Sequence, residues 1–199
     1  MIRVSGCLMA DEKMLEKYSR LYLEVIMRYR DYIEERETLH AAQLPTLITP
    51  KDPSVVSKVE GIKHMFSSYN YDSDFLEASK EAEFYVRSKI AATSLPIQFW
   101  LKPSQTMELE SGDAFDKAVL LCSLFIGLGN VSSKIIAKVT DGDCRLSVYY
   151  EFKGKAFLFD MEGSVKEFPG RAEMLASMGM NSPGADAYEF NDLMYNGLT

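Results

Sequence analysis

Residues able to act as nucleophiles or proton acceptors are few in this chain, and they are far apart. The 199 residues include three cysteines, Cys7, Cys122 and Cys144, and two histidines, His40 and His64. A thiol enzyme needs a histidine that can take the proton of its cysteine. Both histidines fall in a part of the chain that reads as helical, where surface or packing roles are the usual ones.

The cysteine environments predict unreactive thiols. Cys122 lies in a nearly continuous apolar segment, so burial would disfavour its thiolate. Cys144 follows Asp141 and Asp143, and nearby carboxylates raise a thiol pKa. An odd number of widely spaced cysteines also fits reduced thiols in a cytoplasmic protein better than a disulfide framework.

A central helix followed by a meander of strands is the strongest structural prediction. Residues 114–128 are apolar on almost every side, which is typical of a helix buried in a domain core. Asp113 is expected to cap its start, and Gly129-Asn130 to end it. Strands are expected at 134–140, 145–152 and 155–160, joined by Asp141-Gly142 and Lys153-Gly154 turns.

The order of motifs from Trp100 to Asp160 resembles the transglutaminase-like superfamily, which shares the papain-like thiol-enzyme architecture. The resemblance is carried by Trp100, Pro103-Ser104-Gln105-Thr106-Met107, Gly112-Asp113-x-Phe115-Asp116, Leu128-Gly129 and Phe159-Asp160. It implies an α+β fold in which the central helix packs on an antiparallel sheet. The family uses a cysteine at the start of that helix, a histidine on one strand and an aspartate at the end of the next strand.

Two of those three catalytic positions are replaced here. The residue after Gly112-Asp113 is Ala114, which has no lone pair for attack. The position implied for the histidine falls on Arg145, with Ser147 next on the same strand face, and neither is a general base at neutral pH. Only Asp160 is retained. An engineered substitution would explain Ala114 but not the missing histidine, so a naturally degenerate site without metal or cofactor is expected.

Three functions remain open on these residues. The first is a catalytically inert module that binds a protein or peptide ligand in the vestigial cleft, in which Arg145 pairs with Asp160 or faces an acidic ligand. The cleft would be lined by Trp100, Asp113, Ala114, Arg145, Ser147 and Asp160. The second is an active amide or peptide hydrolase, or acyl transferase, with non-standard residues, for which His64 is a remote candidate. The third is an assembly or adaptor protein that acts through its N-terminal helix.

The first half of the chain is predicted to be a helical extension. Apolar residues three and four apart over 11–40 predict one long helix, whose apolar face is expected to face a core rather than a partner. A proline-containing linker is expected at 44–53, then helices from Ser54 and from a cap at Asp72 or Asp74. The predicted domains are therefore 1–95, helical, and 96–199, the α+β core, packed as one unit, with the remainder after residue 177 wrapping the surface.

Charge and hydropathy exclude some partners. The formal net charge is −7, and no Lys/Arg cluster is present, so nucleic acid is a poor candidate. No apolar run approaches the roughly 20 residues of a membrane-spanning helix, and no secretory signal is recognised. A cytoplasmic protein with a protein or peptide partner is expected, and self-association is left open.

Overall fold

The computed structural model describes residues 5–37, 41–93, 99–140, 143–161, 164–179 and 186–198. The chain divides into two compact units, residues 1–38 with 95–99 and residues 39–94 with 100–199. The division falls near residue 38, whereas the sequence suggested a boundary at 95 and a single unit. The helices that were expected between residues 54 and 95, as part of an N-terminal extension, therefore belong to the same unit as the sheet.

The first unit consists, among its described residues, of two helices and Phe99. Helix α1 spans Ser5–Arg28 and α2 spans Arg30–Glu37. The predicted single helix over 11–40 is thus corrected: it begins earlier and is interrupted at Tyr29, although Tyr29 N still donates to the Val25 carbonyl at 3.1 Å. From Met14 onward the large apolar side chains of α1 are exposed, apart from the half-buried Ile26, contrary to the expected core-facing position.

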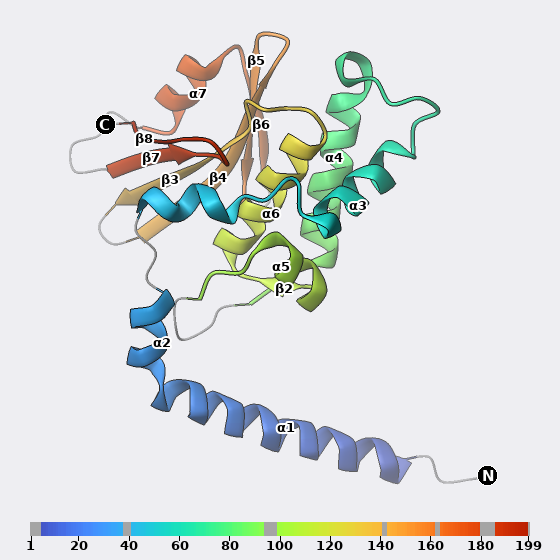
Figure 1. Cartoon of the computed structure of the whole chain (residues 1–199), viewed down its shortest axis with the longest axis vertical. Coiled ribbons are helices and arrows are strands. Elements are labelled where there is room, and N and C mark those ends of the chain that lie inside the picture. Colours follow the sequence, from blue (N-terminus) through green and yellow to red (C-terminus); the bar gives the residue numbers. More distant parts are fainter. Residues whose placement is uncertain are drawn as a thin grey trace. The chain divides into compact units, whose positions relative to one another are not determined.

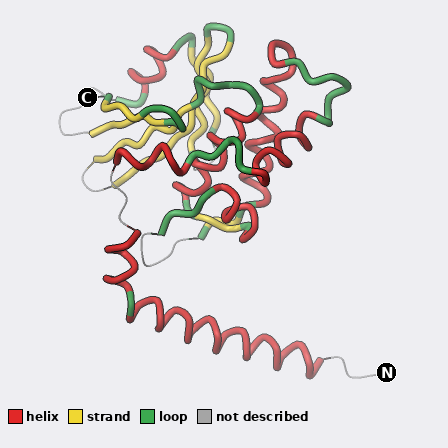
Figure 2. Tube along the Cα trace, in the orientation of Figure 1, coloured by secondary structure: helices red, strands yellow, loops and turns green. Residues whose placement is uncertain are grey.

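The second unit is built on an antiparallel sheet of order β6-β5-β4-β3-β7-β8 (Figures 1 and 2). Its strands are β3 (Lys134–Thr140), β4 (Asp143–Phe152), β5 (Lys155–Asp160), β6 (Val165–Phe168), β7 (Asp186–Phe190) and β8 (Tyr195–Gly197). The three predicted strands are confirmed, with β4 starting two residues earlier. Lys153 and Gly154 both have positive φ, at 50° and 77°, which is the geometry of a tight hairpin turn.

The C-terminal part corrects the sequence analysis. Helix α7 spans Arg171–Ser177, and the residues that follow it do not simply wrap the surface. Strand β7 pairs with β3 inside the sheet, and its Ala187 and Phe190 are fully buried. Its five residues carry a weak signal, since the Gly/Asn/Pro-rich segment before it suggested a loop.

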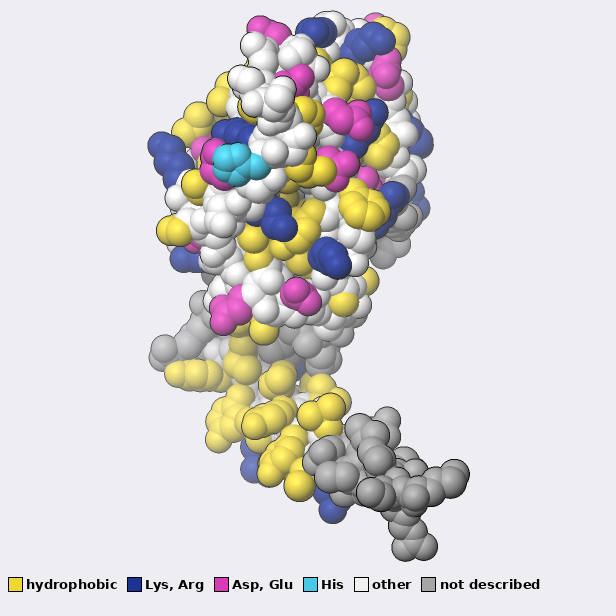
Figure 3. Space-filling view, turned by 90° about the vertical axis from the view of Figure 1, so that its right-hand side faces the viewer, with side chains coloured by type: hydrophobic (Ala, Val, Ile, Leu, Met, Phe, Trp, Pro, Cys, Tyr) yellow, Lys and Arg dark blue, Asp and Glu magenta, His cyan; other side chains and the backbone are white. Residues whose placement is uncertain are grey.

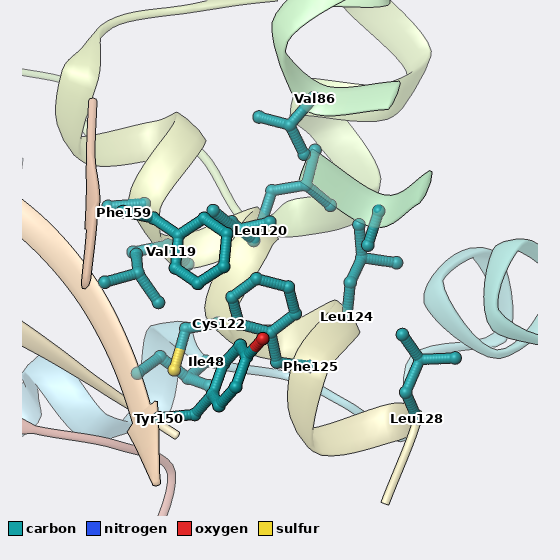
Figure 4. Packing of buried hydrophobic residues seen from close by; sticks show 14 of the residues in the cluster. Ile48, Val86, Val119, Leu120, Cys122, Leu124, Phe125, Leu128, Tyr150 and Phe159 are labelled. Carbon is teal, nitrogen blue, oxygen red and sulfur yellow. The ribbon is translucent and has the colours of Figure 1, made fainter. Parts of the chain in front are cut away.

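Helix α6 (Ala114–Gly127) packs against the sheet at the centre of this unit, as predicted for the central helix. It contacts α3 (Pro53–Lys63), α4 (Tyr71–Lys89), α5 (Pro103–Leu109) and β4. Figure 4 shows Val119, Leu120 and Phe125 of α6 packed toward Tyr150 and Phe159 of the sheet. The expected α+β class, with a central helix packed on an antiparallel sheet, is confirmed by these residues.

Three local features differ from expectation. The predicted linker begins with the 3₁₀ helix η1 (Ala41–Leu47), which accommodates Pro45 because Pro45 can still accept from Ile48 N. The N-cap of α4 is Asn70, which accepts from Asp72 N at 2.9 Å, rather than Asp72 or Asp74. Helix α5 was not predicted, since seven residues give too short a periodic pattern.

Candidate functional site

The start of α6 is held by a reciprocal pair of carboxylates. Asp113, the N-cap, accepts from Asp116 N at 2.9 Å, and Asp116 Oδ2 accepts from Asp113 N at 3.1 Å. The predicted cap is therefore confirmed, and two otherwise unsatisfied amides of the first turn are paired. Ala114, the first residue of the helix, is exposed beside this pair.

Asp116 also ties the segment before α5 to the same turn. Its Oδ1 accepts from Leu101 N at 2.8 Å, and only 3% of the residue is exposed. Burial raises the pKa of Asp116 to about 6, with a further contribution from the charge of Asp113, although the backbone hydrogen bonds lower it. Gly112 is required here, because an added Cβ would lie 2.8 Å from the Asp116 Cβ.

A stacked pair of aromatic rings flanks Ala114. The Trp100 and Phe115 ring centroids are 5.2 Å apart with an interplanar angle of 28°, and Phe115 in turn stacks on Phe190 of β7 at 6.3 Å. Trp100 and Phe115 are both partly exposed, whereas Phe190 is buried. Because the hydrogen bond to Leu101 fixes the chain next to Trp100, the indole is held beside the helix start.

Asp160 lies along the first turns of α6. It lines a cavity of about 40 Å³ together with Lys117 and Leu121 of α6 and Val86 of α4. Lys117 is three residues after Ala114, one turn further along the helix. By strand alternation Asp160, the last residue of β5, shares the side of Ala156 and Leu158, which pack with Met174 of α7.

Arg145 and Ser147 lie on the other side of the sheet. Leu146, Val148 and Tyr150 of β4 pack in the cluster that contains α6, whereas Tyr149 packs with Met174 of α7. Since side chains alternate along a strand, Arg145 and Ser147 share the side of Tyr149. Ser147 is buried opposite Asp160 in the register, so these two side chains share one side of the sheet, and Arg145 is exposed opposite Lys138.

No thiol or imidazole is placed at the helix start by the described residues. Cys122 is fully buried, and desolvation strongly raises its pKa; desolvation also raises the pKa of the exposed Cys144. His64 is exposed at the C-terminal cap of α3. His40 lies outside the described residues.

The sequence analysis missed three contributors to this region. Phe115 was seen only as a motif residue, although it forms the stack with Trp100. Asp116 was likewise named only as a motif residue, and Lys117 was not singled out. The spacing Asp113-x-x-Asp116 does match a capping box, so that signal was available, whereas the approach of Leu101 is not encoded by any local pattern.

The described residues form neither a candidate metal site nor a candidate membrane span. No group of three or more His, Cys, Asp or Glu side chains is arranged there to hold a metal ion. Nor does any described helix combine the length and apolar character that crossing a bilayer requires.

Comparisons with known proteins give structural likeness only. No protein-family model matches the sequence, and no significant match occurs among curated proteins. Among solved structures, Legionella pneumophila LapG is similar at a TM-score of 0.49 and 12% identity, over 81% of this chain and 90% of that chain. EGTA-treated LapG gives 0.48 and 10%, over 82% and 88%. Calcium-bound LapG gives 0.44 and 15%, over 70% and 87%.

Proposed function

We propose that this chain is a catalytically inert, transglutaminase-like module that binds a protein or peptide ligand at the start of α6. The observation that carries the proposal is the exposed Ala114 at the first position of a firmly capped helix, flanked by the Trp100–Phe115 stack. An alanine methyl supplies no electron pair for attack on a carbonyl, so thioester chemistry has no starting point there.

Ligand binding is supported by the chemistry of this surface. Partly exposed aromatic rings supply large apolar area with little loss of conformational entropy on binding. The start of α6 carries the positive end of the helix dipole, which favours a neutral peptide carbonyl, whereas Asp113 and Asp116 would repel a ligand carboxylate. An extended peptide could therefore lay an apolar side chain on Trp100 and direct a carbonyl oxygen toward Ala114.

The alternative, an active hydrolase or acyl transferase, needs a nucleophile and a base near the helix start. Within the part of the chain that the structure describes, the polar side chains of this region include Ser111, which bonds Thr93, with Asp113 and Asp116 at the cap and Lys117 and Asp160 at the neighbouring cavity; none is a thiol or an imidazole. Carboxylates and an ammonium do not reproduce a thiolate–imidazole pair. The observations favour a binding role.

The test is selection of a random peptide library on the immobilised full chain, followed by affinity measurement on the Trp100→Ala variant. We expect enriched peptides whose affinity falls about tenfold or more in Trp100→Ala, since aromatic anchors dominate small interfaces. Phe84→Ala on α4 is the matched control, because Phe84 is an exposed aromatic residue outside this region.

Three results would count against the proposal. One is a selection that enriches nothing, and another is a set of peptides that binds Trp100→Ala as tightly as the wild type. The third is hydrolysis of casein or of peptide p-nitroanilides by the wild-type chain, which would return the alternative to first place.

A further inference from the structure

Helix α1 presents a broad stripe of exposed apolar side chains. Leu15 is 70% exposed and Tyr22 is 64% exposed. The stripe consists of Leu15, Tyr18, Tyr22, Val25 and Tyr29, flanked by Met14 and Leu21, all of them exposed. Figure 3 shows hydrophobic side chains gathered along the described part of this helix.

The spacing of these residues matches a helix-pairing seam. The steps from Leu15 through Tyr18, Tyr22 and Val25 to Tyr29 are three, four, three and four residues. The mean step of 3.5 residues is the repeat by which one helix packs along another. The hydrogen bond from Tyr29 N to the Val25 carbonyl keeps the helical geometry through the last member.

The side of the helix opposite the seam is mainly charged. Lys17, Arg20 and Glu24 occupy the opposite side at 100° per residue, so the seam has a defined direction. Two apolar residues, Leu23 and Met27, lie outside the stripe on that charged side. They are 49% and 47% exposed.

The area available is sufficient for a stable pair. Seven half-exposed large side chains that each lose about 100 Å² give roughly 700 Å² per helix and about 1,400 Å² for two helices. Specific interfaces start near ~1,200 Å². A lone helix with this stripe has little to stabilise it, since helices depend on packing of their apolar face.

We infer that α1 is a self-association element, and that its seam is covered by the α1 seam of a second copy of this chain. Two copies of α1 have the same spacing of three and four residues between apolar side chains. Their seams therefore match in period and in length, and no other part of the chain is needed to cover them. The inference does not depend on the ligand-binding role of the α6 start.

The test is the molar mass of the full chain across a concentration series, measured by light scattering coupled to size-exclusion chromatography. We expect a dimer for the wild type and a monomer for Leu15→Glu/Tyr22→Glu, because two charges in the seam would have to be buried. Leu23→Glu/Met27→Glu is the matched control, since it adds the same charges outside the seam. It should remain a dimer.

Two outcomes would overturn the inference. A wild-type chain that stays monomeric up to high concentration excludes self-association. If that monomeric chain binds phosphatidylcholine vesicles through α1, the seam contacts a membrane surface instead of a second copy. Equal loss of the dimer in the seam variant and the control variant would show that the seam is not the contact. Far-UV circular dichroism and thermal melting verify that the second unit remains folded in each variant.

Discussion

Asp116 joins three backbone positions through one carboxyl group and its own amide. It accepts from Leu101 N and Asp113 N, and its own N–H donates to Asp113. This single residue therefore sets both the direction in which α6 begins and the position of the segment that carries Trp100. The first turn of α6 is held by Asp113 and Asp116, so its stability does not depend on the side chain of Ala114.

The titration of Asp116 should appear in the stability of the protein. Its folded-state pKa of about 6 lies above the ordinary value, chiefly because of burial, so the folded state binds this proton more tightly than the unfolded state. Stability from this group is complete at low pH and decreases as pH rises from about 4 to about 6.

We predict that Asp116→Asn is destabilised most at pH 4, and that the deficit relative to wild type shrinks up to about pH 6 and is constant above it. The amide also places a donor against Asp113 N, so a residual deficit of about 1–3 kcal/mol remains. Urea denaturation at several pH values measures both effects. A deficit that increases with pH would show that the carboxyl pKa is lowered in the folded state.

Helix α7 is attached to the sheet by a buried polar network. Glu189 of β7 accepts from Tyr149 at 2.6 Å, from Lys134 at 2.9 Å and from Arg171, the first residue of α7, at 3.0 Å. At the other end of the helix, Lys138 donates to the Met178 carbonyl at 2.7 Å. These contacts fix a seven-residue helix that is too short to be stable alone.

Burial alone would raise the pKa of Glu189, but the hydrogen bonds from Tyr149, Lys134 and Arg171 outweigh it and hold the pKa below its usual value. We predict that Glu189→Gln costs roughly 3 kcal/mol of unfolding free energy, because it leaves partly buried cations without their counter-charge. Since the pKa is lowered, this stabilisation is present at neutral pH and is lost only as pH falls through the lowered value.

Glu167→Gln is the control for that measurement. Glu167 also pairs with a lysine, Lys155, but both side chains are more than half exposed, so little change in unfolding free energy is expected. Equal effects of the two substitutions would contradict the assignment of Glu189 as the anchor of α7.

The second unit encloses one large core around α6, and Cys122 lies within it, fully buried. Its thiol can meet a reagent only when the packing around α6 opens. Cys144, at the exposed start of β4, is an internal reference on the same chain. The rate at which Cys122 is modified, compared with that of Cys144, therefore measures whether the core of the second unit is folded.

We predict that iodoacetamide at pH 8.5 modifies Cys144 in the native protein but leaves Cys122 unmodified. In a urea series, modification of Cys122 should follow the loss of circular dichroism, because exposure requires global unfolding. Mass spectrometry of a Cys7→Ser chain measures both sites. Labelling of Cys122 at the rate of Cys144 in native buffer would show that the core opens locally.

The local sequence pattern was sufficient to predict the helices and strands in which apolar residues recur with a clear period. It located α6 and its cap at Asp113, β3, β5 and the turn at Lys153-Gly154, because apolar spacing and turn residues act over a few positions. It was insufficient for β7 and α5, whose five and seven residues carry too little periodicity.

From the residue types at 114, 145 and 160, the sequence alone predicted that the thiol and the imidazole of the resembled family are absent. Only the tertiary structure determined which side chains surround residues 114, 145 and 160. Strand alternation turned Ser147 toward the α7 side, and Leu101 and Phe190 approached the helix start from distant parts of the chain. Local pattern cannot encode such contacts, because each depends on packing between segments that are far apart in sequence.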